Sequence, residues 1–330
     1  MPWDFLGNEW AVEHLRKHAS DRAPRHAYLI FGPAGIGRRT LALRFAMALN
    51  CTQPTLAGDA CGMCRACSLL AKMQHPDLEV VQANQAAGQL KVDQIRELQH
   101  RLALAPYEAR YRIALLLNFE RANASAANAL LKTLEEPPER VILILTADSP
   151  ESLLPTIVSR CEGIRLRPVE MDYLAALLIS RLGISAEQAQ LLSHLSNGCP
   201  GLAIQLHDEP HRIAEWQAGV QAHLHLLTES WIERFALAEH LAKEKDRQRL
   251  MLTLQCWLSF WRDVLISSNQ ASSSLTNINL KEEISNTAQK ITWQQAFASM
   301  SAIQKTITLL DSNVNTRLAL ENLMLQLPQL

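Results

Sequence analysis

The chain has 330 residues, 48% of them hydrophobic, and a formal net charge of -1. This length is sufficient for a large core divided among two or three domains, and the balanced charge does not point to a nucleic-acid-binding protein. No apolar run reaches the ~18 residues of a membrane span, and the first residues do not resemble a signal peptide. We therefore expect a cytoplasmic protein without a membrane association.

A glycine-rich loop is the first motif along the chain. A short amphipathic helix over residues 8–17 precedes an apolar strand over 27–31, and Gly32, Gly35 and Gly37 follow that strand. A helical pattern then runs to residue 50. A glycine loop between a strand and a helix presents backbone N–H groups and a helix N-terminus to phosphate. The sequence therefore predicts a phosphate-binding loop.

The loop departs from that pattern at the positions that carry its chemistry. A working loop has Lys after its last glycine, to contact the β- and γ-phosphates, and then Ser or Thr to bind Mg²⁺. This chain has Arg38 and Arg39 there, and Thr40 comes one position too late. The planar guanidinium of Arg does not replace the compact ammonium of Lys. We expect an inherited loop that has lost catalysis, and the sequence leaves open whether ATP or ADP binds it.

Four cysteines form the second motif. Cys51 is followed by Cys61, Cys64 and Cys67, with two residues between each of the last three. Because disulfides are rare in the cytosol, this clustering indicates metal, and four thiolates satisfy a tetrahedral Zn²⁺ that has no open position. We expect a structural zinc module over residues 51–67. An iron–sulfur cluster uses similar spacing and is the alternative ligand.

A second departure lies at the end of a buried strand predicted over residues 112–117. In a P-loop ATPase this strand ends in an acidic residue that holds Mg²⁺. Here Leu117 and Asn118 occupy those positions, and Glu120 lies too far along the chain to replace them. The magnesium site is therefore also expected to be lost.

The remaining pattern predicts an α/β region followed by an all-helical one. Strand and helix signals alternate up to residue 166 and strand signals then disappear. Besides the elements already named, we expect strands over 78–82, 141–146 and 164–166 and helices over 91–103, 123–136, 152–158, 173–182, 186–196 and 200–207. Long helical periodicities follow over 211–263 and 291–327. The strands are expected to form a parallel, doubly wound sheet.

Several of these segments resemble the AAA+ clamp-loader family. The most specific is the run Asn128-Ala-Leu-Leu-Lys-Thr-Leu-Glu-Glu-Pro-Pro138, and Ser159-Arg160-Cys161 is the second. The cysteine module after the loop helix is similar to the family's zinc module, and the stretch from Asn313 to Glu321 is similar to its last helix. The resemblance covers nearly the whole chain, although residues 210–300 match by helical character alone.

The resemblance implies a particular kind of subunit. The gamma/tau subunit of this family keeps a Lys-Thr loop, an Asp-Glu pair and an Arg near the start of a helix in the lid, where this chain has Gly201. Loss of three ATPase positions with retention of Arg160 suits a subunit that does not hydrolyse ATP. Such a subunit supplies Arg160 as an arginine finger to a neighbour's ATP. The alternative is that Arg160 is only a surface salt-bridging residue at a helix end.

By this resemblance the chain has three domains: an AAA+ nucleotide-fold domain over 1–166, a helical lid over 167–208 and a helical collar over 209–330. The collar would join gamma/tau and delta subunits in a hetero-oligomeric ring. That ring loads the sliding clamp onto primed DNA as part of the DNA polymerase III holoenzyme, a nucleotidyltransferase.

Two other functions are compatible with parts of the pattern. One is a self-sufficient ATPase that uses Arg38 and Thr40 in an altered loop. The other is a stand-alone zinc-dependent DNA-binding protein, which the lack of a concentrated basic stripe with aromatic residues disfavours. ATP turnover by the isolated chain separates the first function from a non-hydrolysing subunit, and salt-sensitive DNA binding would be needed for the second.

Overall fold

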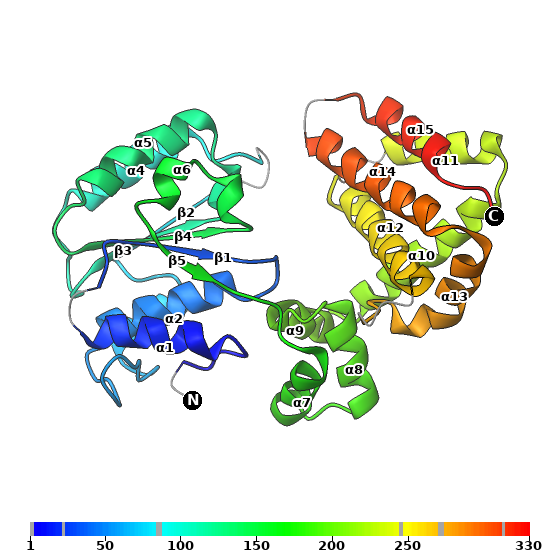
Figure 1. Ribbon diagram of the computed structural model, residues 1–330. Helices are drawn as coiled ribbons and strands as arrows, with labels where there is room; N and C mark the ends of the chain where they lie inside the picture. The colour runs from blue at the N-terminus through cyan, green and yellow to red at the C-terminus, as the bar shows by residue number, and fades with distance from the viewer. Residues whose placement is uncertain (1–2, 22–23, 84–87, 244–246, 270–273, 312–313) are drawn as a thin grey trace. The chain divides into compact units, whose positions relative to one another are not determined.

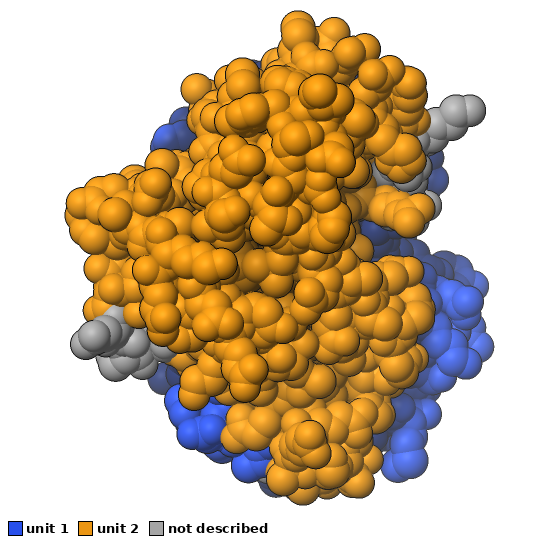
Figure 2. Space-filling view, turned by 90° about the vertical axis from the view of Figure 1, so that its right-hand side faces the viewer, with its two compact units in different colours: residues 1–177, 198–202 blue, residues 178–197, 203–330 orange. Residues whose placement is uncertain are grey.

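The chain forms two compact units, which Figure 2 colours separately. The computed structural model describes all residues except 1–2, 22–23, 84–87, 244–246, 270–273 and 312–313. Asn313, at the start of the predicted terminal motif, lies outside the described residues. The first unit comprises Met1–Leu177 and Gly198–Leu202, and the second comprises Leu178–Asn197 and Ala203–Leu330. The division into three domains at residues 166 and 208 stays a prediction.

The first unit is built on a five-stranded parallel sheet with the order β2-β3-β4-β1-β5. Its strands are β1 (Ala27–Phe31), β2 (Leu78–Gln82), β3 (Arg112–Leu117), β4 (Val141–Ala147) and β5 (Glu162–Arg165). Every residue of β3 and β4 is buried, as expected for central strands covered on both faces. The predicted strands are confirmed, and the last begins at Glu162 instead of Ile164.

Helices cover both faces of this sheet. They are α1 (Glu9–Ser20), α2 (Arg38–Asn50), α3 (Arg65–Ala71), α4 (Val92–Leu102), α5 (Ala124–Glu135) and α6 (Pro155–Val158). Figure 1 shows α1 and α2 on one face and α4, α5 and α6 on the other. The helix predicted over 152–158 is a 3-10 turn followed by the short α6, because Pro155 lacks an N–H and begins a new helix. Helix α3 is not among the helices that the sequence predicts.

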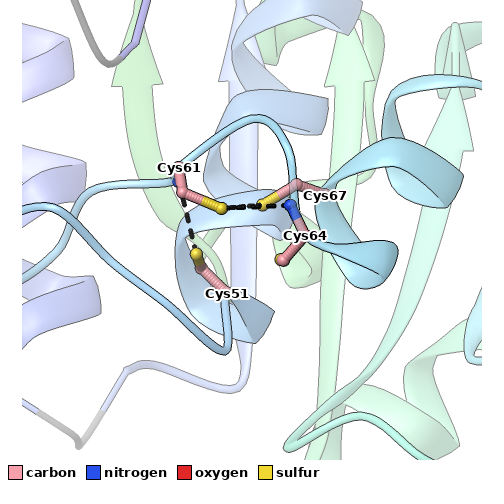
Figure 3. A group of neighbouring side chains, drawn as sticks. All are labelled: Cys51, Cys61, Cys64 and Cys67. Atoms are coloured by element: carbon pink, nitrogen blue, oxygen red, sulfur yellow. Dashed lines mark hydrogen bonds between the residues drawn. The ribbon is translucent and has the colours of Figure 1, made fainter.

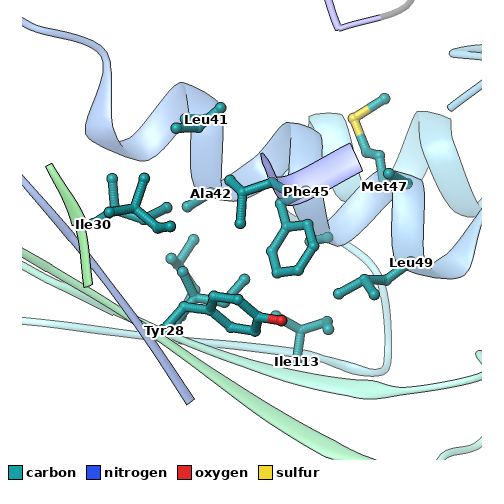
Figure 4. Close-up of a cluster of buried hydrophobic side chains, with 14 of the residues drawn as sticks. Tyr28, Ile30, Leu41, Ala42, Phe45, Met47, Leu49 and Ile113 are labelled. Atoms are coloured by element: carbon teal, nitrogen blue, oxygen red, sulfur yellow. The ribbon is translucent and has the colours of Figure 1, made fainter. Parts of the chain in front are cut away.

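Side chains from alternate strand positions enter two separate cores. Tyr28 and Ile30 of β1 pack with Phe45 of α2 on one face, the cluster shown in Figure 4. Leu29 of the same strand packs on the opposite face, in the cluster that contains Leu130 of α5. This follows from the two-residue period of a strand, whose neighbouring side chains point to opposite faces. Both faces of the sheet are therefore packed against helices. This packing fixes the position of the edge at which the parallel strands end, called here the carboxyl edge.

In the second unit, the regular secondary structure of the described residues consists of helices and one 3-10 turn. The helices are α8 (Ala186–Leu195), α10 (His211–Thr228), α11 (Trp231–Lys243), α12 (Arg247–Ser268), α13 (Lys281–Lys290), α14 (Trp293–Asp311) and α15 (Thr316–Gln326). Helices α7 (Met171–Leu182) and α9 (Pro200–Asp208) are divided between the two units. The predicted fold class, an α/β region followed by an all-helical one, is confirmed.

The core of the second unit also holds buried polar groups. Trp261 is fully buried, and its Nε1 donates to Nε2 of His223 at 2.7 Å. Arg234 is likewise fully buried and donates to the backbone carbonyls of Leu226, Leu227, Leu327 and Pro328. These bonds join the end of α10 to the residues that follow α15. Because buried donors are costly unless paired, Arg234 specifies how the end of the chain packs.

Candidate functional site

The glycine loop joins β1 to α2, as the sequence predicts. Gly35 and Gly37 have φ values of 77° and 106°, a region that favours glycine. The start of α9 packs on the loop within the first unit, where the N–H of Leu202 donates to the carbonyl of Gly35 at 3.0 Å. A Cβ atom on Gly201 would lie 2.7 Å from the Gly35 carbonyl oxygen. Gly201 stands where the gamma/tau subunit has an Arg. There is therefore no room for a side chain at this position unless the loop moves.

Arg38 directly follows the last glycine of the loop and begins α2, and its side chain contacts residues at the carboxyl edge of the sheet. Its Nη1 is 2.6 Å from Oδ1 of Asp148, which directly follows β4, and its side chain is only 10% exposed. Nη2 of Arg38 also donates to Oδ1 of Asn118, which follows β3, at 3.4 Å. Arg39 instead contacts Sδ of Met73, and Arg39 and Thr40 are both exposed. Of the two arginines in the loop, Arg38 alone is paired with a carboxylate at this edge in the described contacts.

Sequence reasoning missed Asp148 and set Glu120 aside, yet both belong to this edge. Oε2 of Glu120 is buried and makes no hydrogen bond within the described residues. Burial raises the pKa of Glu120, the Asp148 carboxylate raises it further, and Arg38 lowers it. The signal for Asp148 was its place immediately after a buried strand, since the carboxyl ends of parallel strands meet at one edge.

The four cysteines lie together, as predicted (Figure 3). Their sulfur atoms are all within 4.8 Å of one another, and Sγ of Cys61 is 4.0 Å from Sγ of Cys67. The N–H of Cys61 donates to Sγ of Cys51 at 3.3 Å, and the N–H of Cys64 donates to Sγ of Cys61 at 3.2 Å. Donation from the N–H groups of Cys64 and Met63 lowers the pKa of the Cys61 thiol. The donor set and its spacing fit a four-thiolate Zn²⁺ site.

An ion pair fastens the cysteine module to α1. Asp59, fully buried within the module, accepts from Nε and Nη2 of Arg16 at 2.8 and 2.9 Å. This is the bidentate geometry that a guanidinium and a carboxylate favour. The two hydrogen bonds to Asp59 raise the pKa of Arg16. The module is therefore held against the first unit by α1 as well as by its connections to α2 and α3.

Arg160 follows the short helix α6. Its Nη1 donates to the carbonyl of Thr156 at 2.9 Å, and its Nη2 pairs with Oε1 of Glu135, at the end of α5, at 2.7 Å. The Arg160 side chain is 35% exposed and that of Glu135 is 52% exposed. The salt bridge that the sequence offered as the alternative role of Arg160 is therefore present. Its exposure also leaves the guanidinium accessible to solvent.

Among the described residues, no helix combines the length and the apolar character that crossing a membrane requires. A family model described as DNA polymerase III, delta subunit, matches residues 7–170. The matched segment includes the glycine loop, the cysteines, Arg160 and all five strands.

Comparison with individual proteins extends the match beyond the sheet. The chain is 40% identical over 218 residues to DNA polymerase III subunit delta′ of Pseudomonas aeruginosa, which covers 65% of each protein. It is 29% identical over 309 residues to subunit delta′ of Bacillus subtilis, which covers 92% of this chain and 91% of that one. It is 35% identical over 211 residues to subunit gamma/tau of Mycobacterium bovis, which covers 62% of this chain and 36% of that one. The chain belongs to the clamp-loader family of DNA polymerase III delta′ subunits.

Proposed function

We propose that the chain is a clamp-loader subunit that does not hydrolyse ATP itself and that helps neighbouring gamma/tau and delta subunits load the sliding clamp onto primed DNA. The delta′ and gamma/tau relatives support the clamp-loader role. The ion pair between Arg38 and Asp148 is the observation that carries the non-hydrolysing part.

Three features of the loop and the adjoining edge of the sheet disfavour hydrolysis. The guanidinium of Arg38 is engaged by Asp148 at 2.6 Å, so binding of phosphate there requires that pair to break. The start of α9 already uses the carbonyl of Gly35, and Leu202 packs against the loop. Strand β3, where a magnesium-binding carboxylate would be expected, ends in Leu117 and is followed by Asn118. Phosphoryl transfer depends on positioning and on the metal ion, so the loss of these groups removes its main contributions.

ATP turnover by the purified chain tests this function. We expect phosphate release at background level from the chain alone, and turnover when it is combined with gamma/tau and delta subunits. Robust turnover by the isolated chain that Gly37→Val abolishes would contradict the proposal. It would instead support the self-sufficient ATPase, because a Cβ atom at Gly37, whose φ is 106°, would meet the ring of Phe5 at 2.8 Å and strain the loop.

The contribution to a neighbour is assigned to Arg160. A partly exposed guanidinium offers fixed charge and several donors, which suit the γ-phosphate of ATP held by another subunit. In this proposal, the ion pair with Glu135 holds the side chain until the neighbour's nucleotide replaces the carboxylate. The four cysteines are assigned a structural Zn²⁺, since four protein thiolates leave no position open for catalysis.

A further inference from the structure

Two histidines of α1 and the first residue of β5 form a cluster that the proposed function does not use. His14 and His18 are one helical turn apart and therefore share a face of α1. Glu162 begins β5, which pairs with β1 and is one of the two edge strands of the described sheet. Nε2 of His14 lies 3.2 Å from Oε1 of Glu162, and the two imidazole rings have their centroids 4.4 Å apart.

The three side chains have the donor atoms and the proximity of a metal site. One ligand atom from each lies within 4.8 Å of the others. Zn²⁺ is bound by imidazole nitrogen and carboxylate oxygen at about 2.0–2.2 Å, so the ligands must move closer together on binding. The half-exposed side chains of His14 and Glu162, 35% and 31% exposed, have the freedom to make that movement. Two imidazoles and one carboxylate are a ligand set that zinc uses in proteins.

A buried residue behind the cluster orients one ligand. Nδ1 of His18 is 2.9 Å from the hydroxyl of Tyr28, whose side chain is fully buried in the first core. This contact leaves Nε2 of His18 as its ligand atom. Metal-binding histidines usually have such a partner on the other ring nitrogen, because it fixes the tautomer and the ring orientation. Burial, and then the neighbouring His14, lowers the pKa of His18, which favours the neutral form that binds metal.

Arg25 competes for the carboxylate in the absence of a metal. Its Nε lies 3.9 Å from Oε2 of Glu162, and its side chain is 70% exposed. A cation bound to Glu162 would be repelled by this guanidinium. Removal of Arg25 should therefore strengthen metal binding at Glu162. A purely structural hydrogen-bond cluster would not show this effect.

We propose that His14, His18 and Glu162 form a second divalent-cation site, separate from the cysteine module, that takes Zn²⁺ with water in the remaining position. A bound ion would join α1 to the edge strand β5, whose first residue is two positions after Arg160. The site would therefore stabilise the base of the segment that carries the proposed finger. It does not depend on the finger, because the ligands and their geometry are independent of what Arg160 contacts.

Equilibrium dialysis against rising free Zn²⁺, with metal quantified in the full-length protein, tests the site. We expect wild-type protein to bind about one equivalent more than His18→Gln does, with the cysteine module occupied in both. His100→Gln changes an exposed histidine of α4 and is the matched control, which should bind as wild type does. Circular dichroism in the absence of added metal establishes that each variant is folded.

Two further variants separate a metal site from a structural cluster. Tyr28→Phe removes only the hydroxyl and should weaken the second equivalent by ~10-fold or more, the usual effect of losing an outer partner of a ligand. Arg25→Gln should tighten it, because the competing charge is gone. Equal zinc binding by wild type and His18→Gln would overturn the proposal. Weaker binding by Arg25→Gln would also do so.

Discussion

In the proposed function, the residue that most clearly distinguishes this chain from a working ATPase is Arg38. Its guanidinium is nearly buried and pairs with Asp148, while Oε2 of Glu120 is buried without a hydrogen bond in the described residues. In this chain the carboxylate of Asp148 therefore pairs with the residue that would contact phosphate in a nucleotide-binding loop.

Restoring the loop residues alone should not restore turnover. We expect the double variant Arg38→Lys, Arg39→Thr to release phosphate at background level, because Leu117 still provides no ligand for Mg²⁺. Steady-state phosphate release from the isolated variant and wild type is the measurement. Turnover by the double variant would show that Asp148 or Glu120 can serve as the magnesium ligand once Arg38 is removed.

Among the elements, the cysteine module is the one that a bound metal ion would stabilise most. Within residues 51–67 only the first three residues of α3 are helical, and much of the rest lies in turns and bends. The fully buried Asp59 attaches it to Arg16 of α1 at 2.8 Å. A short segment with so little regular structure has few contacts of its own, so a structural metal contributes directly to its folding.

We expect the purified protein to contain about one equivalent of tightly held Zn²⁺ bound by the four cysteines. Cys64→Ser should lose this zinc and loosen residues 51–67, seen as faster hydrogen exchange there, while the rest of the sheet keeps its protection. Cys256→Ser, which changes a buried cysteine of the second unit, is the control and should retain zinc. Iron in the metal analysis, or no metal in protein purified without chelator, would contradict the assignment.

At the scale of the whole molecule, the proposed function requires other subunits. Arg160 makes its intramolecular ion pair with Glu135 at 2.7 Å, and the pair is partly exposed. Such a pair contributes little to stability in water. If Arg160 served the fold alone, its replacement would therefore change stability and activity only slightly. If it contacts a neighbour's ATP, its replacement would lower ATP hydrolysis strongly.

In the complex assembled with gamma/tau and delta, Arg160→Ala should leave assembly intact but lower clamp-stimulated ATPase and clamp loading. The step served by a finger typically slows by ~10³ or more, and total turnover falls only in part because other sites have their own fingers. Arg160→Lys should rescue poorly, since an ammonium lacks the planar fork.

The control for this prediction is Glu135→Gln, which removes the ion pair and keeps the guanidinium. If Arg160 acted only through Glu135, both variants would impair loading equally. We expect Glu135→Gln to hydrolyse ATP and load clamps nearly as wild type does. Equal activity of Arg160→Ala and wild type in the full complex would also contradict the finger.

The sequence by itself determined the features that are encoded over a few neighbouring residues. The apolar strands, the glycine loop before Arg38 and the cysteine spacing are of this kind, because strand burial, loop conformation and metal-ligand spacing depend on local residue order. Short elements were less predictable: α3 was missed, and the helix predicted over 152–158 begins only at Pro155.

Only the tertiary structure decided which distant residues meet. The strand order places β4 between β1 and β3, so that Asp148 and Asn118 reach Arg38 at one edge of the sheet. The pairing of β1 with β5 likewise brings Glu162 to His14. Strand order and register are set by the packing of the whole sheet and its helices. No local pattern in the chain specifies them, and that is why these contacts could not be predicted from the sequence.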